Sequence, residues 1–313
     1  MKVLVTGADG FVGTHLVQAL RARGDTVEPC GGPDVPGGLE VTRWAAVEAR
    51  VRESAPDAVI HLAGISSVAR SHEHPATTVA VNVLGAANLL ESVKRHASRA
   101  RVLLVGSGEV YGAVASGHPA IETDLLRPLS PYAASKVAAE VLGRQMAASY
   151  GLHVVLARPF NHLGPGQAPG FVVPSLTRQL LDIARGAAPP VVEVGDLSPV
   201  RDFSHVLDVI DGYLLLLERG QPGEVYNLCS GTGSSIRELL DELQRLIGTH
   251  AEVRVDPQRL RPVEIPWLVG DPTRMESLGW RRVRTVRDAL SDVIESLGGR
   301  RPSVTGSEPE STR

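Results

Sequence analysis

Three glycines at fixed spacing follow the first apolar run of the chain. They lie in the segment GADGFVG at 7–13, between a strand-like run at 2–6 and a helical pattern at 12–23. The first glycine of such a turn permits a tight bend, the second lets a pyrophosphate approach the backbone, and the third lets the helix pack close to the strand. The helix N-terminus offers free N–H groups to phosphate oxygens. The segment therefore predicts a dinucleotide site, with cofactor contacts at Gly7, Gly10, Phe11, Val12 and Gly13.

Short apolar runs alternate with helical stretches through the first half of the chain. Strand-like runs at 57–62, 101–105 and 152–157 are separated by helical patterns at 77–96 and 131–150. Strands that alternate with helices of this length favour a parallel sheet with helices on both faces. We therefore expect an α/β fold: a doubly wound parallel (Rossmann) sheet with a smaller C-terminal substrate-binding domain.

The pattern changes after Pro159. Gly and Pro crowd the segment 161–170, which is typical of a loop over a ligand. Helical patterns follow, and in one of them Ser235 precedes Glu238 by three residues, as in a capping box. The later helices are expected at 174–185, 205–219 and 235–247. We expect a dinucleotide-binding domain at 1–160 plus about 201–228, a substrate-binding domain at about 161–200 plus 229–299, and a disordered tail at 300–313.

Composition and charge argue against several classes of function. The 313 residues carry a formal net charge of −3 without a marked Lys/Arg run, which argues against a nucleic-acid partner. Cys30 and Cys229 are far apart, and there is no CxxC pair or Cys/His cluster, so we expect no metal site. No apolar run approaches the ~18 residues that span a bilayer, and the N-terminus lacks the pattern of a signal peptide. We expect a cytoplasmic protein without a membrane partner.

A Tyr-x-x-x-Lys pattern supplies a candidate proton-transfer pair. Tyr132 and Lys136 lie four residues apart in a predicted helix, so their side chains share one face. A free tyrosine has a pKa of ~10. A nearby ammonium favours the phenolate, so we expect Lys136 to lower the pKa of Tyr132 and to prepare it for proton exchange with a substrate oxygen. Ser107, just beyond the strand-like run at 101–105, is expected to hydrogen-bond that oxygen.

The sequence allows two interpretations for each of two carboxylates and for the identity of the cofactor. Glu109, in the same loop as Ser107, is either a second acid/base or a side chain that bonds the backbone. Glu40 either meets the adenine or is a surface carboxylate. The segment 27–32 places neither the acidic residue that holds the ribose of NAD nor an Arg for the 2′-phosphate of NADP at the expected strand end. The cofactor is expected to be NADP(H) or NAD(H), with a slight preference for NADP(H).

These segments together resemble the extended short-chain dehydrogenase/reductase superfamily, in its NAD-dependent epimerase/dehydratase group. The resemblance extends over about residues 1–298. The matching segments are VTGADGFVG at 5–13, HLAG at 61–64, GSGEVYG at 106–112, SPYAASK at 130–136, RPFNHLGPGQ at 158–167, RDFSHVLDV at 201–209 and EVYNLCSG at 224–231. Further segments, RPVEIP at 261–266 and VGDPTR at 269–274, resemble group members that act on guanosine diphosphate sugars.

The resemblance implies roles at the matching positions. Ser107, Tyr132 and Lys136 match the catalytic hydroxyl, tyrosine and lysine, and Glu109 matches the glutamate that dehydratase relatives use as a base at sugar C5. The implied further cofactor contacts are Leu62, Ala63, Gly64 and Pro159. The implied substrate contacts are Asn161, Arg178, Arg201, Arg261 and Glu264. Arginines suit a diphosphate because they donate forked hydrogen bonds, and Asp202 is expected only to orient its neighbour Arg201.

The implied reaction is a reduction. Hydride from NAD(P)H would go to C4 of GDP-4-keto-6-deoxy-D-mannose and a proton from Tyr132 to O4, giving GDP-D-rhamnose. One alternative is a redox-neutral nucleotide-sugar 4-epimerase or GDP-mannose 4,6-dehydratase with tightly bound NAD(P), and another is a non-catalytic nucleotide sensor on the same fold. Members of the group usually pair through helices such as those at about 77–97 and 131–150, which implies a homodimer.

Overall fold

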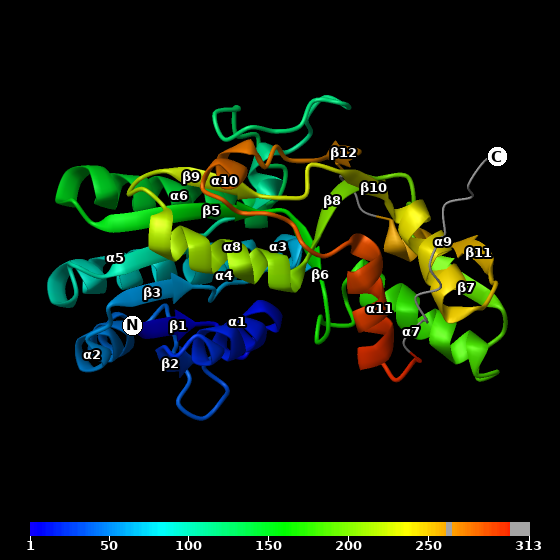
Figure 1. The fold of residues 1–313 in the computed structure, drawn as a ribbon, viewed down its shortest axis with the longest axis horizontal. Helices are drawn as coiled ribbons and strands as arrows, with labels where there is room; N and C mark the ends of the chain where they lie inside the picture. Colours follow the sequence, from blue (N-terminus) through cyan, green and yellow to red (C-terminus); the bar gives the residue numbers. More distant parts are fainter. Residues whose placement is uncertain (261–264, 301–313) are drawn as a thin grey trace, which may run out of the picture.

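The main sheet of the protein consists of six parallel strands. The structure, a computed structural model, describes residues 1–260 and 265–300, and this sheet fills one end of the molecule (Figure 1). The strand order is β2–β1–β3–β4–β5–β9, and every neighbouring pair is parallel. The strands are β1 (Lys2–Thr6), β2 (Thr26–Cys30), β3 (Ala58–His61), β4 (Arg101–Val105), β5 (His153–Pro159) and β9 (Val225–Leu228). The predicted parallel α/β sheet is confirmed.

Helices cover both faces of this sheet, so both faces are apolar. Val3 of β1 shares one core with helices α1 and α8, and its neighbour Leu4 shares the opposite core with α2, α5 and α6. Adjacent side chains of a strand point to opposite faces, which explains why the strands are continuous apolar runs. The helices are α1 (Phe11–Ala22), α2 (Trp44–Ser54), α5 (Gly85–His96), α6 (Pro131–Tyr150) and α8 (Val206–Arg219).

The stretch expected to be one helix at 77–96 contains a π-helical turn. It consists of α4 (Pro75–Val79), the π turn η1 (Ala80–Leu84) and α5, and α3 (Val68–Glu73) precedes it. The side chain of Asn82 in the π turn bonds both the N–H and the C=O of Ile65. Such turns arise where a helix accommodates an extra residue, and periodicity alone does not reveal them.

The same stretch corrects one expectation about membranes. Pro75–His96 spans 22 residues and contains an 18-residue window with a mean hydropathy of 1.2, long and apolar enough to cross a bilayer by length and composition. The expectation that no such run exists is therefore wrong. Half of the apolar window is buried inside the fold, where α5 packs against α2 and α6.

A second group of elements follows β5 and has its own core. β8 pairs in parallel with β6 and β12 and antiparallel with β10, and β7 pairs with β11. Their core is completed by α7, α9 and α11, and the capping box expected at Ser235 and Glu238 is confirmed at the start of α9. The bounds are β6 (Asn161–Leu163), α7 (Val172–Ala184), β7 (Val191–Val194), β8 (Val200–His205), β10 (Gly233–Ser235), α9 (Ile236–Ile247), β11 (Glu252–Val255), η3 (Pro257–Arg259), β12 (Trp267–Leu268) and α11 (Val286–Ser296). The short helix α10 (Thr273–Ser277) belongs instead to the core of the main sheet, where it packs against β9.

The chain passes back and forth between the two groups of elements. It leaves the main sheet after β5, and β8 still belongs to the small sheet, whereas α8 and β9 return to the large one. It leaves again at β10. The division into two domains stays a prediction, and so does the disordered tail, of which 301–313 lie outside the described residues.

Candidate active site

The sequence-predicted cofactor residues gather at one edge of the main sheet. β1, β3, β4 and β5 are parallel neighbours, so their carboxyl ends lie along the same edge. Gly7 follows β1, the segment 62–64 follows β3, Ser107 follows β4, and Pro159 ends β5. Ligands of open parallel α/β sheets bind outside the carboxyl ends of the strands. The fold therefore brings together four segments that are far apart in the sequence.

The glycine turn has the shape that a pyrophosphate requires. Gly7 has a φ of +69°, and a Cβ there would lie 2.7 Å from the backbone N of Ala63. A Cβ at Gly13 would lie 2.2 Å from the carbonyl oxygen of Gly7, so the helix approaches the turn too closely for any side chain. At Gly10, in contrast, the nearest atom lies 3.3 Å away, and no acidic residue occupies the first turn of α1. Phe11 and Val12 follow, half-buried. Gly10, the N-cap of α1, leaves the backbone without a side chain there, and α1 offers its first N–H groups to an anion.

Tyr132, Ser107 and Lys136 lie close together at the carboxyl end of β4. Tyr132 lies in the first turn of α6, which Pro131 begins and Ser130 caps by accepting the N–H of Ala133 at 3.1 Å. The Tyr132 and Ser107 side chains are hydrogen-bonded to each other, and Tyr132 is only 8% exposed. Lys136 donates from Nζ to the carbonyl oxygen of Val105 at 2.9 Å, with Nζ 6.0 Å from the centroid of the Tyr132 ring. The three side chains expected to act together are therefore neighbours.

The pKa of Tyr132 moves in the direction opposite to the one expected from the sequence. The pKa of Tyr132 is raised to about 12, mainly by burial; the Ser107 hydrogen bond lowers it in part, and the negative charge of Glu109 contributes to the rise. Burial also lowers the pKa of Lys136 to about 8. The expectation that Lys136 depresses the tyrosine pKa is wrong because desolvation of the phenolate dominates, and Lys136 is not among the groups that shift this pKa. At neutral pH Tyr132 keeps its proton and is ready to donate it.

The two carboxylates with open roles lie in different surroundings. Glu109 is half-buried in the 3₁₀ turn η2 (Gly108–Tyr111), near enough for its charge to act on Tyr132. The Glu40 carboxylate accepts hydrogen bonds from both the N–H and the hydroxyl of Thr42, at 3.1 and 2.7 Å. It therefore stabilises the turn in which it lies. A catalytic role for Glu109 and an adenine contact for Glu40 both stay predictions.

A carboxylate from the glycine turn lies just beyond the end of β2, where the sequence of β2 itself supplies none. Cys30, the last residue of β2, is fully buried. Asp9, from the glycine turn, accepts the N–H of Gly32 at 3.0 Å just beyond that strand. A carboxylate therefore lies where the ribose of a dinucleotide is usually held. The choice between NAD and NADP stays open on these residues.

The expected substrate residues lie on the second group of elements. Asn161 is exposed on β6, which pairs in parallel with β8, the strand that carries Arg201. Arg201 is 6% exposed and donates to the carbonyl oxygen of Val200. Arg178 is exposed on α7. Arg261 and Glu264 lie outside the described residues.

Asp202 does not have the role expected from its neighbour Arg201. Its carboxylate is fully buried and accepts the backbone N–H groups of Ser230, Gly231 and Gly270 at 2.7, 2.9 and 3.4 Å. Burial raises its pKa to about 6 although these hydrogen bonds oppose the shift. Adjacent residues of a strand point to opposite faces, so Asp202 ties the loops after β9 and β12 instead of orienting Arg201.

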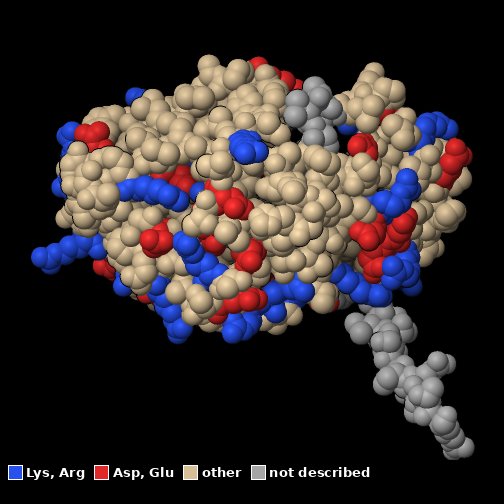
Figure 2. Space-filling view, turned by 90° about the horizontal axis from the view of Figure 1, so that it is seen from above, with Lys and Arg blue, Asp and Glu red and all other residues tan. Residues whose placement is uncertain are grey.

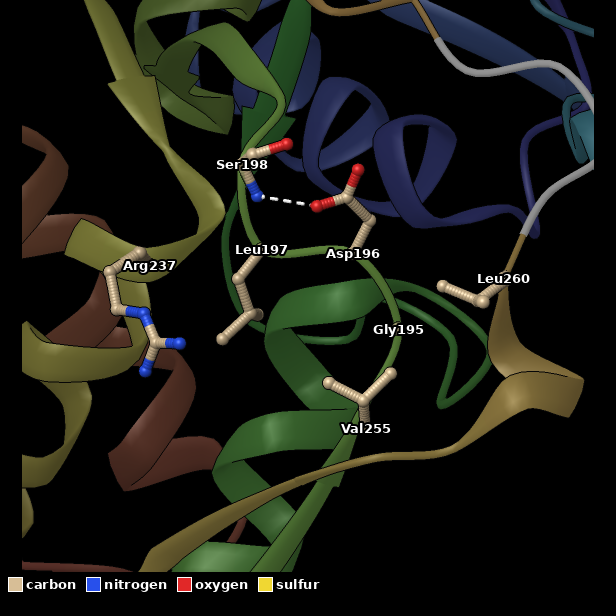
Figure 3. A pocket seen from close by; sticks show the side chains of 7 residues that line it. All are labelled: Gly195, Asp196, Leu197, Ser198, Arg237, Val255 and Leu260. Atoms are coloured by element: carbon tan, nitrogen blue, oxygen red, sulfur yellow. Dashed lines mark hydrogen bonds between the residues drawn. The ribbon is translucent and has the colours of Figure 1, made fainter.

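A cavity of about 440 Å³ opens in the second group of elements (Figure 3). Leu197 and Arg237 lie on one side of it, and Val255 and Leu260 lie on another. The Asp196 carboxylate accepts the N–H of Ser198 at 2.8 Å on its wall. Leu260 directly precedes the expected substrate residue Arg261. None of the lining residues was singled out by the sequence, because they come from four separate segments.

The face in Figure 2 carries charges of both signs side by side, without a stripe of one sign. This distribution agrees with the small net charge of −3. Among residues 1–260 and 265–300, no group of three or more His, Cys, Asp or Glu is placed to hold a metal ion.

The site can now be compared with known proteins. The family described as GDP-mannose 4,6 dehydratase matches residues 39–293 of the chain. The chain belongs to this family.

The matches to individual relatives cover nearly the whole length of the chain. GDP-6-deoxy-D-mannose reductase of Pseudomonas aeruginosa is 38% identical over 96% of this chain and 98% of its own. A structure of RMD from Pseudomonas aeruginosa complexed with NADPH superposes with a TM-score of 0.86 at 36% identity, covering 95% of this chain and 98% of that one. A UDP-glucose 4-epimerase of Thermus thermophilus in complex with NAD gives 0.85 at 32%, covering 95% and 99%. The resemblance to the epimerase/dehydratase group is confirmed.

The sequence patterns did not single out one buried residue near the site. His61 ends β3 and is 3% exposed; its Nδ1 lies 2.7 Å from the Thr6 hydroxyl, which also accepts the N–H of Ala63. Its Nε2 is buried and has no hydrogen-bond partner among the described residues. Burial, with the charge of Lys136, lowers the pKa of His61 to about 3. The segment HLAG contained the signal, but only its last three residues were assigned a role.

His61 should make the protein sensitive to mild acid. Its pKa falls from 6.5 to about 3 on folding, so the neutral form stabilises the fold above pH 6.5, and this contribution is lost as the pH falls toward 3. Between pH 7 and pH 5 the free energy of unfolding should fall by about 2 kcal/mol through this group. Urea unfolding of His61→Gln should lack this part of the fall, whereas His118→Gln, at an exposed position, should keep it. Equal pH dependence in wild type and His61→Gln would contradict the assignment.

Proposed function

We propose that this protein reduces the 4-keto group of GDP-4-keto-6-deoxy-D-mannose, with NAD(P)H as hydride donor, to give GDP-D-rhamnose. The observation that carries the proposal is the buried Tyr132, protonated and hydrogen-bonded to Ser107 at the carboxyl end of β4. The 38% identity with a GDP-6-deoxy-D-mannose reductase over 96% of the chain supports this choice of substrate. The NADPH and NAD in structures at 36% and 32% identity support the cofactor.

The chain's own residues can do the acid half of this reaction. When bound, the nicotinamide supplies a hydride to C4, and the electron pair of the C4=O double bond moves onto O4. Tyr132 donates its proton to O4, so that a ketone becomes an alcohol. Ser107 shares a hydrogen bond with the same oxygen and holds it within reach. A pKa of about 12 guarantees that Tyr132 carries its proton at neutral pH.

Proton donation leaves a buried phenolate, and the Lys136 ammonium lies 6.0 Å from the centroid of its ring. With a pKa of about 8, Lys136 is mostly protonated at neutral pH. Its bond to the Val105 carbonyl fixes the ammonium at the end of β4, next to Gly64, where a Cβ would lie 3.6 Å from Nζ. Lys136 therefore stabilises the phenolate when it forms, although it does not create that phenolate beforehand.

The second group of elements is proposed to hold the nucleotide. Arg201 and Asn161 lie on paired strands, and Arg178 extends from α7. Arginine side chains bind the oxygens of a diphosphate with forked, charge-assisted hydrogen bonds. We include Arg261 and Glu264 in this proposal on the basis of the resemblance alone.

A redox-neutral epimerase or dehydratase is the second candidate. The observation that favours it is Glu109, a carboxylate close enough to Tyr132 to raise its pKa. Such an enzyme would be purified with oxidised cofactor and would turn over without added reductant. A non-catalytic sensor is less well supported, because a sensor has no use for a buried proton donor.

The assay for the proposal combines GDP-4-keto-6-deoxy-D-mannose with NADPH or NADH. Wild type should oxidise the reduced cofactor. Tyr132→Phe should lower kcat by at least ~10²-fold because the proton donor is lost, while binding of the reduced cofactor stays intact. Tyr150→Phe, at the exposed end of the same helix, should keep full activity. No cofactor oxidation by wild type with either nucleotide, or an active Tyr132→Phe, would overturn the proposal.

We also infer a homodimer built on the face of α4, η1 and α6, in a cytoplasmic protein without a membrane partner. Val79, Leu84 and Val141 are 48%, 47% and 57% exposed on these neighbouring segments. Apolar side chains gathered on one face favour contact with another protein surface. Sedimentation of the native protein with the membrane fraction would contradict the proposed location.

Charge introduced into this face should separate the subunits. Val141→Asp combined with Leu84→Asp would bury carboxylates in the proposed interface, which is strongly unfavourable. Light scattering after gel filtration should give a dimer mass for wild type and a monomer mass for the double variant. Val283→Asp, at a 76% exposed position outside these segments, should remain dimeric. A monomeric wild type would disprove the inference.

A further inference from the structure

A fully buried guanidinium lies between the two segments that carry the active-site side chains. Arg158 of β5 is 1% exposed. Its Nε and Nη2 donate to the two carboxylate oxygens of Glu140 at 2.8 and 2.7 Å, and its Nη1 donates to the Tyr111 hydroxyl at 2.7 Å. Nη1 also reaches the carbonyl oxygen of Glu122 at 3.2 Å. All three nitrogens of this side chain are therefore used inside the protein.

One end of this network is the helix face that carries Tyr132 and Lys136. Glu140 follows Lys136 by four residues and Tyr132 by eight on α6, so the three side chains share one face of the helix. Glu140 is 4% exposed. Arg158 binds both carboxylate oxygens of Glu140. This pairing therefore fixes the rotation of α6 about its axis and its position along that axis relative to β5.

The other end is the turn that carries Ser107 and Glu109. Tyr111 ends this turn, and its hydroxyl donates to the Asn227 side chain on β9 at 2.6 Å while accepting from Arg158. The Arg158 guanidinium carbon lies 4.8 Å from the centroid of the Tyr111 ring. Within the turn, Ser107 Oγ accepts the N–H of Glu109 at 3.2 Å. The position of Tyr111 thus sets the position of Ser107 through a short hydrogen-bonded turn.

We propose that Tyr111 is a positioning residue for the reaction. Through Arg158 and Glu140, it fixes the position of the turn that carries Ser107 relative to the face of α6 that carries Tyr132. The inference rests on the proposed function, because it assigns to that reaction a residue that touches none of the reacting atoms. Satisfied buried polar networks hold a single geometry, and small errors in geometry are costly in an active site. Ser107 and Tyr132 come from different elements, and this network is a buried polar link between them.

Tyr111→Phe tests the proposal with little disturbance of packing. It keeps the ring that stacks on Phe160 and lies under Arg158, and removes only the hydroxyl. Replacing Arg158 or Glu140 would leave an unpaired buried charge and endanger folding. Tyr111→Phe should lower kcat by roughly 10- to 100-fold, with KM for the sugar nucleotide within about twofold, because substrate binding is unchanged and alignment is lost.

A double-mutant cycle separates positioning from a general loss of structure. If Tyr111 acts through Ser107, its removal has little further effect once Ser107 is replaced, so Ser107→Ala/Tyr111→Phe should be about as slow as Ser107→Ala alone. If the two effects multiply instead, Tyr111 does not act through Ser107, and the proposal is overturned. Tyr226→Phe is the matched control: a buried tyrosine on β9 that loses one hydroxyl contact, to the N–H of Gln221 at 3.2 Å. It should keep wild-type kcat.

A second readout needs no substrate. The chain has five tyrosines, so ¹³C labelling at Cζ gives few signals, and Tyr132→Phe identifies the one of interest. Tyr111→Phe should shift the Tyr132 signal because its hydrogen bond to Ser107 changes, and Tyr226→Phe should not. A shifted signal in a protein that does not reduce the sugar nucleotide would refute the proposed reaction and keep the positioning role. An unshifted signal would refute the positioning role, whatever the reaction.

Discussion

The hydrogen bond between the buried side chains of Tyr132 and Ser107 is the contact on which the active site depends. It joins α6 to the turn after β4, at the edge of the sheet where the carboxyl ends of β1 and β3 also lie. Burial keeps the phenol protonated, and the serine hydroxyl opposes this only in part. The site is therefore built to hold a proton and to give it up when a substrate oxygen acquires negative charge. That property suits reduction of a ketone better than abstraction of a proton.

The architecture explains how residues so far apart in sequence meet. Parallel strands bring every carboxyl end to one edge, so each strand contributes one loop to the same place. Gly7 and Gly13 let the first loop and α1 approach within distances that no side chain permits. Around this edge the protein buries polar groups in pairs: Thr6 with His61, Asn82 with Ile65, and Arg158 with Glu140. Such groups are costly to bury unless they are paired, so they restrict the site to one arrangement.

Much of this was visible in the sequence, because local patterns determine it. The glycine spacing and the strand–helix alternation predicted the sheet, and the four-residue spacing of Tyr132 and Lys136 placed them on one helix face. What failed depends on burial or on distant contacts. The pKa of Tyr132 rises because the surrounding fold excludes water, and Asp202 binds loops that follow β9 and β12 instead of its neighbour Arg201. The spacing of residues along a chain does not show which side chains lose their water on folding, nor which loops meet across a sheet.

In the proposed reaction, this chain moves a hydride from a nicotinamide to C4 of the sugar while Tyr132 protonates O4. Incubation of the purified protein with GDP-4-keto-6-deoxy-D-mannose and NADPH deuterated at the transferred position, followed by NMR of the product, tests that claim most directly. The account predicts one deuterium at C4 of a GDP-6-deoxyhexose and an equal amount of oxidised cofactor. A converted sugar that contains no deuterium from the cofactor would contradict it.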